Sequence, residues 1–157
     1  MAEYGEILRP ELVLLGPMGS ELAGKPQLLI SLYPVEQSLD KPVTGKHWKA
    51  TPGTRMMELL HATDVPLGFV TNGEEWMLVF APRGDTTGFT SWYASLWIDE
   101  PITLRAFHSL LSTSRFFGVA PLDTLLALLK ESAQDQQEVT NQLGDQVRDA
   151  GSTDPGV

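Results

Sequence analysis

The chain has 157 residues, a length that fits one domain able to bury a hydrophobic core without covalent staples. It contains no cysteine, which excludes disulfides and thiolate metal sites. Its formal net charge is −9, so it lacks the overall basic footprint of most nucleic-acid-binding proteins, and any contact with DNA must come from a local patch. The N-terminus carries no apolar segment of signal-peptide or membrane-span length, which favours a cytoplasmic protein without membrane contact.

Apolar runs in the first part of the chain predict two strands. Residues 7–8 and 12–15 predict a strand region interrupted by a proline, and the continuous apolar run 28–33 predicts a buried strand. Residues 35–50 are polar and predict a loop. This region therefore opens the chain with strands and not with a helix.

The middle of the chain predicts a helix followed by a hairpin. Thr51 and the proline after it are a good helix start, because threonine caps a helix and proline loses nothing at its first position. We expect this helix to run to about residue 62. In the stretch 66–80 two apolar runs flank Asn72 and Gly73, both of which tolerate positive φ, and this pattern predicts a tight β-hairpin.

The remaining elements are a loop, a strand and two helices. We expect a loop over 81–90, a strand over 91–98 and a helix over 102–111. Nearly heptad apolar spacing then predicts one long amphipathic helix, or two in series, over 122–147. Helices that alternate with strands favour an α+β or α/β fold.

Four stretches of the chain together carry a resemblance to a known family. They are Thr71-Asn72-Gly73 with Trp76 after it, residues 48–60, residues 114–119 and residues 128–148. With these stretches, about residues 7–149 resemble the N-terminal region of large type IIG-like restriction-modification adenine-specific DNA methylases. That region is a PD-(D/E)XK-type nuclease domain.

The resemblance implies an α/β (α+β) fold, namely a truncated restriction-endonuclease-like mixed sheet with flanking helices and a long C-terminal helix. It divides the chain into a restriction-endonuclease-like domain over 1–118 and an amphipathic linker or interaction helix over 119–150. A disordered tail is expected over 151–157. The front is shorter than in the family, where a helix precedes the first strand.

The resemblance also implies where a nuclease centre would lie. In the family an acid after proline on one strand and a Glu-x-Lys on the next hold a divalent metal that activates water. Glu11 takes the place of the first acid, whereas Ser31 and Tyr33 stand where the second acid and the lysine belong. Glu36 is the candidate for a migrated second acid. We therefore expect a degenerate centre with no metal or other cofactor, and Mg²⁺ only if Glu11 and Glu36 form an active nuclease.

Cationic and aromatic side chains before and within the first helix form a candidate DNA-binding patch. Lys46, Trp48, Lys49 and Arg55 combine charges for phosphates with a ring that can stack on a base. The alternative is a solvated loop with a tryptophan that anchors the core. The net charge of −9 favours this alternative.

The methyltransferase of the resembled proteins is missing, since the chain has neither an Asn-Pro-Pro-Tyr tetrapeptide nor a glycine-rich SAM loop. We expect a fragment or stripped-down relative without activity of its own, acting in DNA engagement or assembly within a restriction-modification or phage-defence system. Its expected partner is a DNA methyltransferase domain or subunit. The alternatives are an active metal-dependent endonuclease and an interaction protein that docks or self-associates through its C-terminal helix, with the apolar side chains Leu122, Leu125, Leu129, Leu143 and Val147.

Overall fold

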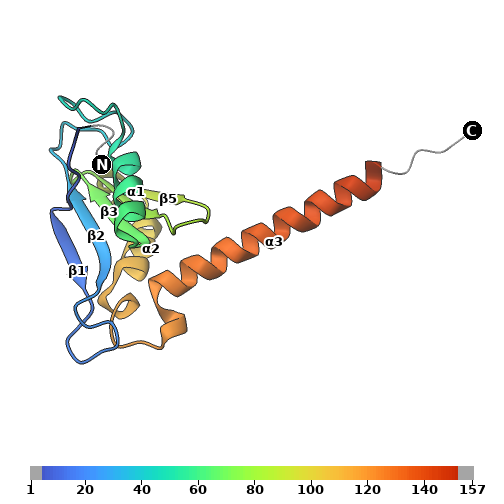
Figure 1. Ribbon diagram of the computed structural model, residues 1–157. Coiled ribbons are helices and arrows are strands. Elements are labelled where there is room, and N and C mark those ends of the chain that lie inside the picture. Colours follow the sequence, from blue (N-terminus) through green and yellow to red (C-terminus); the bar gives the residue numbers. More distant parts are fainter. Residues whose placement is uncertain (1–4, 152–157) are drawn as a thin grey trace, which may run out of the picture.

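The computed structural model describes residues 5–151, except for the side chains of residues 137 and 144–150. It is an α/β fold in which a five-stranded mixed sheet is flanked by helices (Figure 1). The strands are β1 (Leu12–Leu15), β2 (Pro26–Leu32), β3 (Leu67–Thr71), β4 (Glu75–Phe80) and β5 (Gly88–Tyr93). The α-helices are α1 (Pro52–Thr63), α2 (Pro101–Leu111) and α3 (Leu125–Gly151).

The strands follow one another across the sheet in the order β1-β2-β3-β4-β5. Neighbouring strands are antiparallel except for β2 and β3, which are parallel. A parallel pair needs a crossover, and α1 provides it between these two strands. Because β2 and β3 lie inside the sheet, the side chains of both alternate between its two covered faces.

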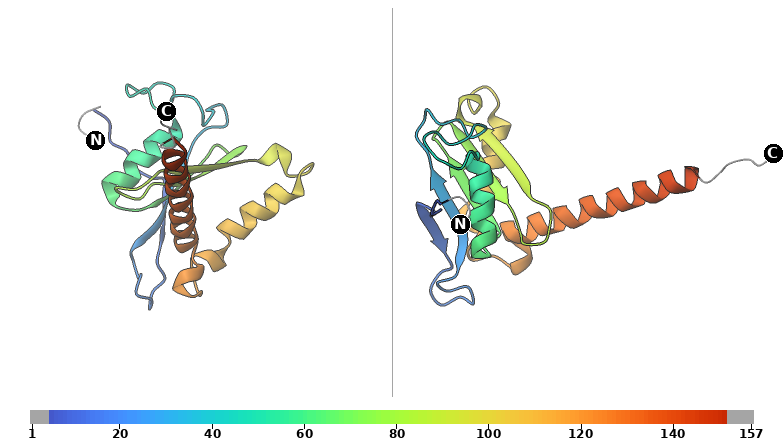
Figure 2. Two further views of the ribbon diagram at one scale, coloured as in Figure 1. Left: turned by 90° about the vertical axis from the view of Figure 1, so that its right-hand side faces the viewer. Right: turned by 45° about the horizontal axis from the view of Figure 1, so that its top comes forward.

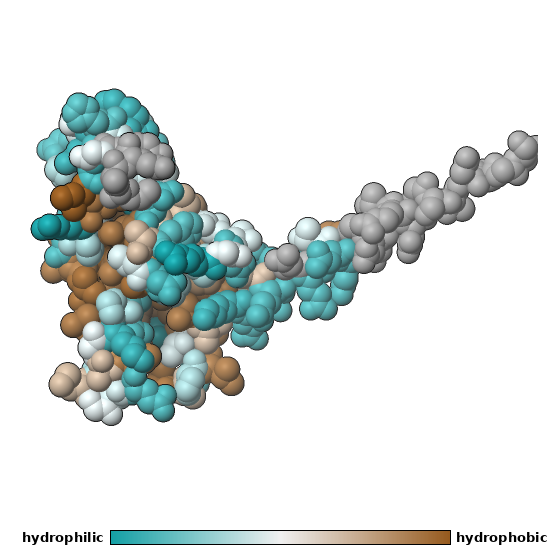
Figure 3. Space-filling model, viewed as in Figure 1, coloured by the Kyte–Doolittle hydropathy of each residue, from teal (hydrophilic) through white to brown (hydrophobic). Residues whose placement is uncertain are grey.

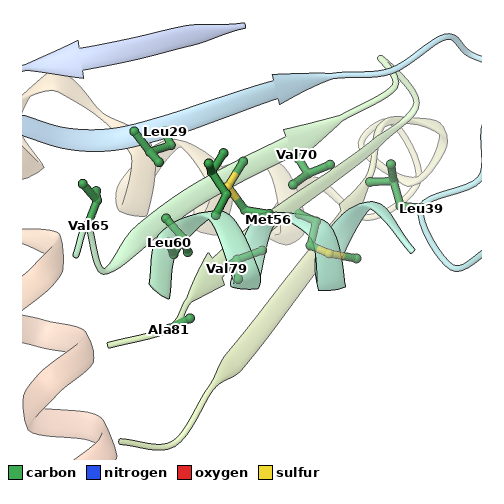
Figure 4. Packing of buried hydrophobic residues seen from close by; sticks show 10 residues of the cluster. Leu29, Leu39, Met56, Leu60, Val65, Val70, Val79 and Ala81 are labelled. Atoms are coloured by element: carbon green, nitrogen blue, oxygen red, sulfur yellow. The ribbon is translucent and has the colours of Figure 1, made fainter. Parts of the chain in front are cut away.

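One face of the sheet is covered by α1. Figure 4 shows Leu29, Val70 and Val79 from three strands pointing toward Met56 and Leu60 of the helix. Gly68 allows this close approach, because a Cβ atom there would lie 2.5 Å from the Met56 side chain. The helix begins as expected, with the hydroxyl of Thr51 accepting from the Thr54 amide at 3.2 Å.

The other face is covered by α2 and the beginning of α3 (Figure 2). Its centre is an aromatic cluster, in which the ring of Phe107 lies 5.6, 5.5 and 5.2 Å from the rings of Trp76, Trp92 and Trp97. Leu125 at the start of α3 is completely buried in the same cluster. The C-terminal helix is thus anchored in the core of the sheet domain.

Beyond its first turns, α3 extends away from the sheet and its covering helices (Figure 1). The visible face of this projecting part is mostly hydrophilic (Figure 3). Among the side chains described in this part, Val139 and Leu143 are apolar and exposed, at 55% and 57% exposure. Within residues 5–151, no helix is both long and apolar enough to cross a membrane.

Several predicted boundaries differ from the structure at its N-terminal and C-terminal parts. Residues 7–8 belong to no strand, and the fifth strand is Gly88–Tyr93 and not 91–98. It starts earlier because Gly88 pairs with Phe80, and it ends at a 3₁₀ turn, Ala94–Leu96. The tail predicted over 151–157 lies outside the described residues, apart from Gly151.

The last helix starts at Leu125 and not at Leu122. A separate 3₁₀ turn, Pro121–Asp123, precedes it, and the hydroxyl of Thr124 then accepts from the Ala127 amide at 3.2 Å as a cap. Leu122 consequently lies outside the helix and is 81% exposed.

The hairpin between β3 and β4 exists, but its turn is not the expected one. Gly73 has a φ of +92°, whereas Asn72 does not adopt a positive φ. Instead the side-chain oxygen of Asn72 accepts from the amides of Glu74 and Glu75 at 3.0 and 2.7 Å. Its Nδ2 atom donates to the carbonyl of Gln37 at 2.9 Å, so the residue ties the hairpin to the loop before α1.

Candidate anion-binding site

A hollow of about 260 Å³ lies on the α1 side of the sheet, beside β1 and β2. Its apolar wall includes Met56 and Leu59 of α1. Its polar lining consists of Arg9, Glu11, Ser31, Tyr33, Lys46 and Arg55. These six residues come from the segment before β1, from β2 and the residue after it, from the following loop and from α1.

The pairing of β1 with β2 places the predicted catalytic positions together. Glu11 lies directly before β1, where its amide donates to the carbonyl of Ile30 at 2.9 Å. Its Oε2 atom accepts from the amide of Leu32 at 3.1 Å. Ser31 and Tyr33 are alternate residues and therefore lie on the same side of the sheet. All three residues of the predicted centre thus line one hollow.

Arg55 is the most firmly held charge of the hollow, at 6% exposure. Its Nη2 atom donates to Oε2 of Glu6 in an ion pair, and its Nη1 atom donates to the carbonyl of Trp48 at 3.3 Å. The guanidinium also lies over the Trp48 ring, 5.2 Å from its centroid. The amide of Trp48 in turn donates to Oε1 of Glu6 at 3.2 Å.

The ionisation of two groups follows from this arrangement. The hydrogen bond from Arg55 lowers the pKa of Glu6 from 4.5 to about 2, with help from the Trp48 amide and against partial desolvation. Burial raises the pKa of Tyr33 above its ordinary value of 10.0, and the Arg55 charge opposes this rise only in part. At neutral pH Glu6 is therefore ionised and Tyr33 carries a neutral hydroxyl.

The structure separates the predicted catalytic pair. Glu11 lines the hollow, whereas Glu36 is exposed on the turn after β2 and is not among the lining residues. In the part of the chain that the structure describes, no group of three or more His, Cys, Asp or Glu side chains could hold a metal ion. A hard divalent cation prefers several oxygen ligands, and Glu11 is the one carboxylate among the lining residues.

The predicted DNA-binding residues divide into two groups. Lys46 and Arg55 line the hollow. Trp48 is half-buried, and its ring lies against the guanidinium of Arg55. Lys49 is exposed and is not among the lining residues.

Two further charged residues of the site were not singled out from the sequence. Arg9 lines the hollow next to the predicted acid, and its position directly before Pro10-Glu11 was an available signal. Glu6 pairs with a residue 49 positions away, and no local pattern predicts such a contact. With Arg9, Lys46 and Arg55 against Glu11 in the lining, the hollow is locally cationic in an acidic chain.

A larger hollow of about 490 Å³ lies between α3 and the ends of β4 and β5. Its lining contains threonine, serine, glutamine, asparagine and apolar side chains but no ionisable group. It offers no acid, base or charge for chemistry. The smaller hollow is the candidate site because it brings together residues singled out from the sequence, namely Glu11, Ser31, Tyr33, Lys46 and Arg55.

Comparisons with protein-family models, curated proteins and solved structures found no significant match to this chain.

Proposed function

We propose that the chain is a catalytically degenerate restriction-endonuclease-like domain of a restriction-modification or phage-defence DNA methylase system. It engages DNA and does not cut it. One observation carries this proposal: Glu11, Ser31 and Tyr33 line one hollow, as the resemblance requires of a nuclease centre, but two of the three are neutral hydroxyls. A neutral hydroxyl replaces neither a carboxylate on a metal ion nor a lysine at the developing charge.

The charges of the hollow support engagement of a phosphate over binding of a metal. Arginine and lysine neutralise phosphates and release counterions, which gives DNA affinity even without base contacts. Three such side chains surround the hollow, while the chain as a whole is acidic. DNA binding is therefore local, weak and sensitive to salt.

Two assays on purified protein test this function. Supercoiled plasmid is incubated with Mg²⁺ or Mn²⁺, and a labelled duplex is titrated by fluorescence anisotropy from about 50 to 200 mM salt. We expect intact plasmid, together with duplex binding that weakens as salt rises. Cleavage that disappears in Glu11→Ala would overturn the degenerate centre, and an absence of binding at the lowest salt would overturn DNA engagement.

The projecting helix α3 favours assembly as a second candidate function. Leu125 is completely buried in the core of the sheet domain and is not available for a partner, and Leu129 is partly buried and packs against that core. Val139 and Leu143 are exposed on the projecting part, where a methyltransferase domain or a second copy of the chain has access to them. The side chain of Val147, also predicted to associate, lies outside the described residues.

The mass of the chain in solution tests self-association through this helix. We expect a dimer that dissociates in a Val139→Asp, Leu143→Asp variant but persists in Ile98→Asp, which changes an exposed apolar side chain away from α3. A monomeric mass at every concentration would exclude self-association. Co-purification with a co-expressed adenine methyltransferase, lost in the α3 variant alone, would then support the heterologous assembly.

A further inference from the structure

The buried Arg55 forms an ion pair with the partly buried Glu6, and the two residues are held by different parts of the chain. Arg55 lies in α1, where its amide donates to the carbonyl of Thr51 at 2.9 Å. Glu6 lies in the segment before β1, which contains no helix or strand. Gly5, directly before it, has a φ of +65°, a conformation that few other residues adopt. The arginine is thus held within a helix, whereas the acid lies on a segment that has no helix or strand over residues 5–11.

The guanidinium of Arg55 is suited to an oxyanion larger than a carboxylate. Its planar fork of donors matches the oxygens of a carboxylate or a phosphate equally well. A terminal or inorganic phosphate carries, as a dianion, more charge than the carboxylate of Glu6, whereas an internal phosphodiester carries one negative charge but belongs to a strand of many phosphates. Arg9 and Lys46 line the same hollow, so that three cations stand against two carboxylates, Glu11 in the lining and Glu6 on Arg55.

We propose that Arg55 binds one phosphate group in the hollow. Glu6 occupies this binding position as an internal competitor until the phosphate displaces it. This inference rests on the proposed function, since it assigns a ligand group to the same site. Ser31 and Tyr33 line the hollow and offer hydroxyl donors to the remaining oxygens. Displacement also breaks the hydrogen bond that the Trp48 amide donates to the other Glu6 oxygen.

Two pairs of variants separate this inference from the general effect of charge. Glu6→Gln removes the competing charge, and Glu21→Gln removes an equal charge from an exposed turn that does not line the hollow. Lys46→Gln removes a lining cation, and Lys25→Gln removes an exposed cation elsewhere. All four proteins are compared with the wild type in the anisotropy titration, after a circular dichroism spectrum has shown that each is folded.

We expect Glu6→Gln to bind the duplex about five- to tenfold more tightly than the wild type, since a neutral amide is a weaker competitor than a charge-assisted one. Glu21→Gln should stay within about twofold. Lys46→Gln should bind more weakly than Lys25→Gln. Equal effects within both pairs would overturn the inference but leave DNA engagement intact, whereas no binding by any protein would overturn both.

A titration of the wild type keeps the inference testable if Glu6→Gln does not fold. Inorganic phosphate is added to ¹⁵N-labelled protein, and the amide signals of Glu6 and Trp48 are followed. We expect the two signals to shift together and saturate at one binding constant. Signals that do not shift up to the highest phosphate concentration would refute phosphate binding by Arg55.

The affinities of two duplexes, one with and one without a 5′-phosphate, show whether the bound phosphate is terminal or internal. An internal phosphodiester gives both duplexes the same affinity, and inorganic phosphate then competes with both. A terminal phosphate makes the phosphorylated duplex bind more tightly. Either result supports a phosphate-binding site at Arg55. If inorganic phosphate competes with neither duplex, this site is contradicted.

Discussion

Replacing Asn72 with alanine is expected to destabilise the fold through the loss of three hydrogen bonds. The side chain is 8% exposed, accepts from the amides of Glu74 and Glu75, and donates to the carbonyl of Gln37. A hydrogen bond contributes about 0.5–1.5 kcal/mol net to stability. We therefore expect Asn72→Ala to lower the free energy of unfolding by about 2–4 kcal/mol, a large share of the usual about 5–15 kcal/mol.

The variant Asn72→Asp separates the contribution of the side-chain oxygen, which accepts two hydrogen bonds, from that of the side-chain nitrogen, which donates one. Asn72→Asp retains the acceptor for both hairpin amides but loses the donor to Gln37, and it places a charge at a nearly buried position. We expect a loss of about 1–2 kcal/mol, since one hydrogen bond is removed and the carbonyl is left without its donor. This loss should be smaller than the loss in Asn72→Ala. The difference between the two variants then gives the contribution of the hydrogen bonds to the hairpin amides.

Urea unfolding followed by tryptophan fluorescence measures both effects. Asn141→Ala is the matched control, because Asn141 is exposed on α3 and alanine is the better helix former. The control should be neutral or slightly stabilising, with the same dependence on urea in all proteins. A loss below about 1 kcal/mol for Asn72→Ala would refute the hydrogen-bond reasoning, because water would then replace the side chain without cost.

Two further predictions concern the anchor of α3 and the ion pair of the site. Leu125→Ala should cost about 2–5 kcal/mol in thermal or urea unfolding because this side chain is completely buried, whereas Leu122→Ala, at 81% exposure, should stay within about 0.5 kcal/mol. Similar losses for both would place α3 outside the core. The pKa of Glu6 is about 2 in the fold against an ordinary 4.5, so its ionised form stabilises the fold above pH 4.5, and this contribution is lost as the pH falls toward 2. The stability difference between the wild type and Glu6→Gln should be constant above pH 4.5 and shrink as the pH falls from 4.5 toward 2, and a difference that grows on acidification would contradict the sign.

The sequence predicts most of the sheet and the first helix because their signals are local. Thr51 and Pro52 fix the start of α1 through the cap and the first-turn proline. The apolar run 28–33 marks β2, whose residues are buried on both faces and thus show no alternation. Gly88 and the residues after it are more polar and mostly exposed, so that only their pairing with β4 identifies them as a strand.

The candidate site was predicted in part, through the positions that the resemblance assigned. Glu11 follows a proline before an apolar run, and Ser31 stands at a fixed place in the next strand, so their meeting follows from strand pairing. Glu6 and Arg9 depend on how the segment before β1 crosses the hollow. That course is set by contacts with α1 and the preceding loop, which a local pattern does not contain.

The ion pair between Glu6 and Arg55 also bears on what the hollow does. Keeping two opposite charges largely out of water is costly, and apolar side chains of similar volume often replace such a pair without loss of stability. Arg55 additionally has a tryptophan ring and a backbone carbonyl arranged around it, so the guanidinium is held in one orientation. Stability alone therefore gives little reason for a fixed arginine beside a hollow lined by two further cations. A ligand with several anionic oxygens gives a direct reason, because such a group uses both the fixed fork of donors and the charges around it.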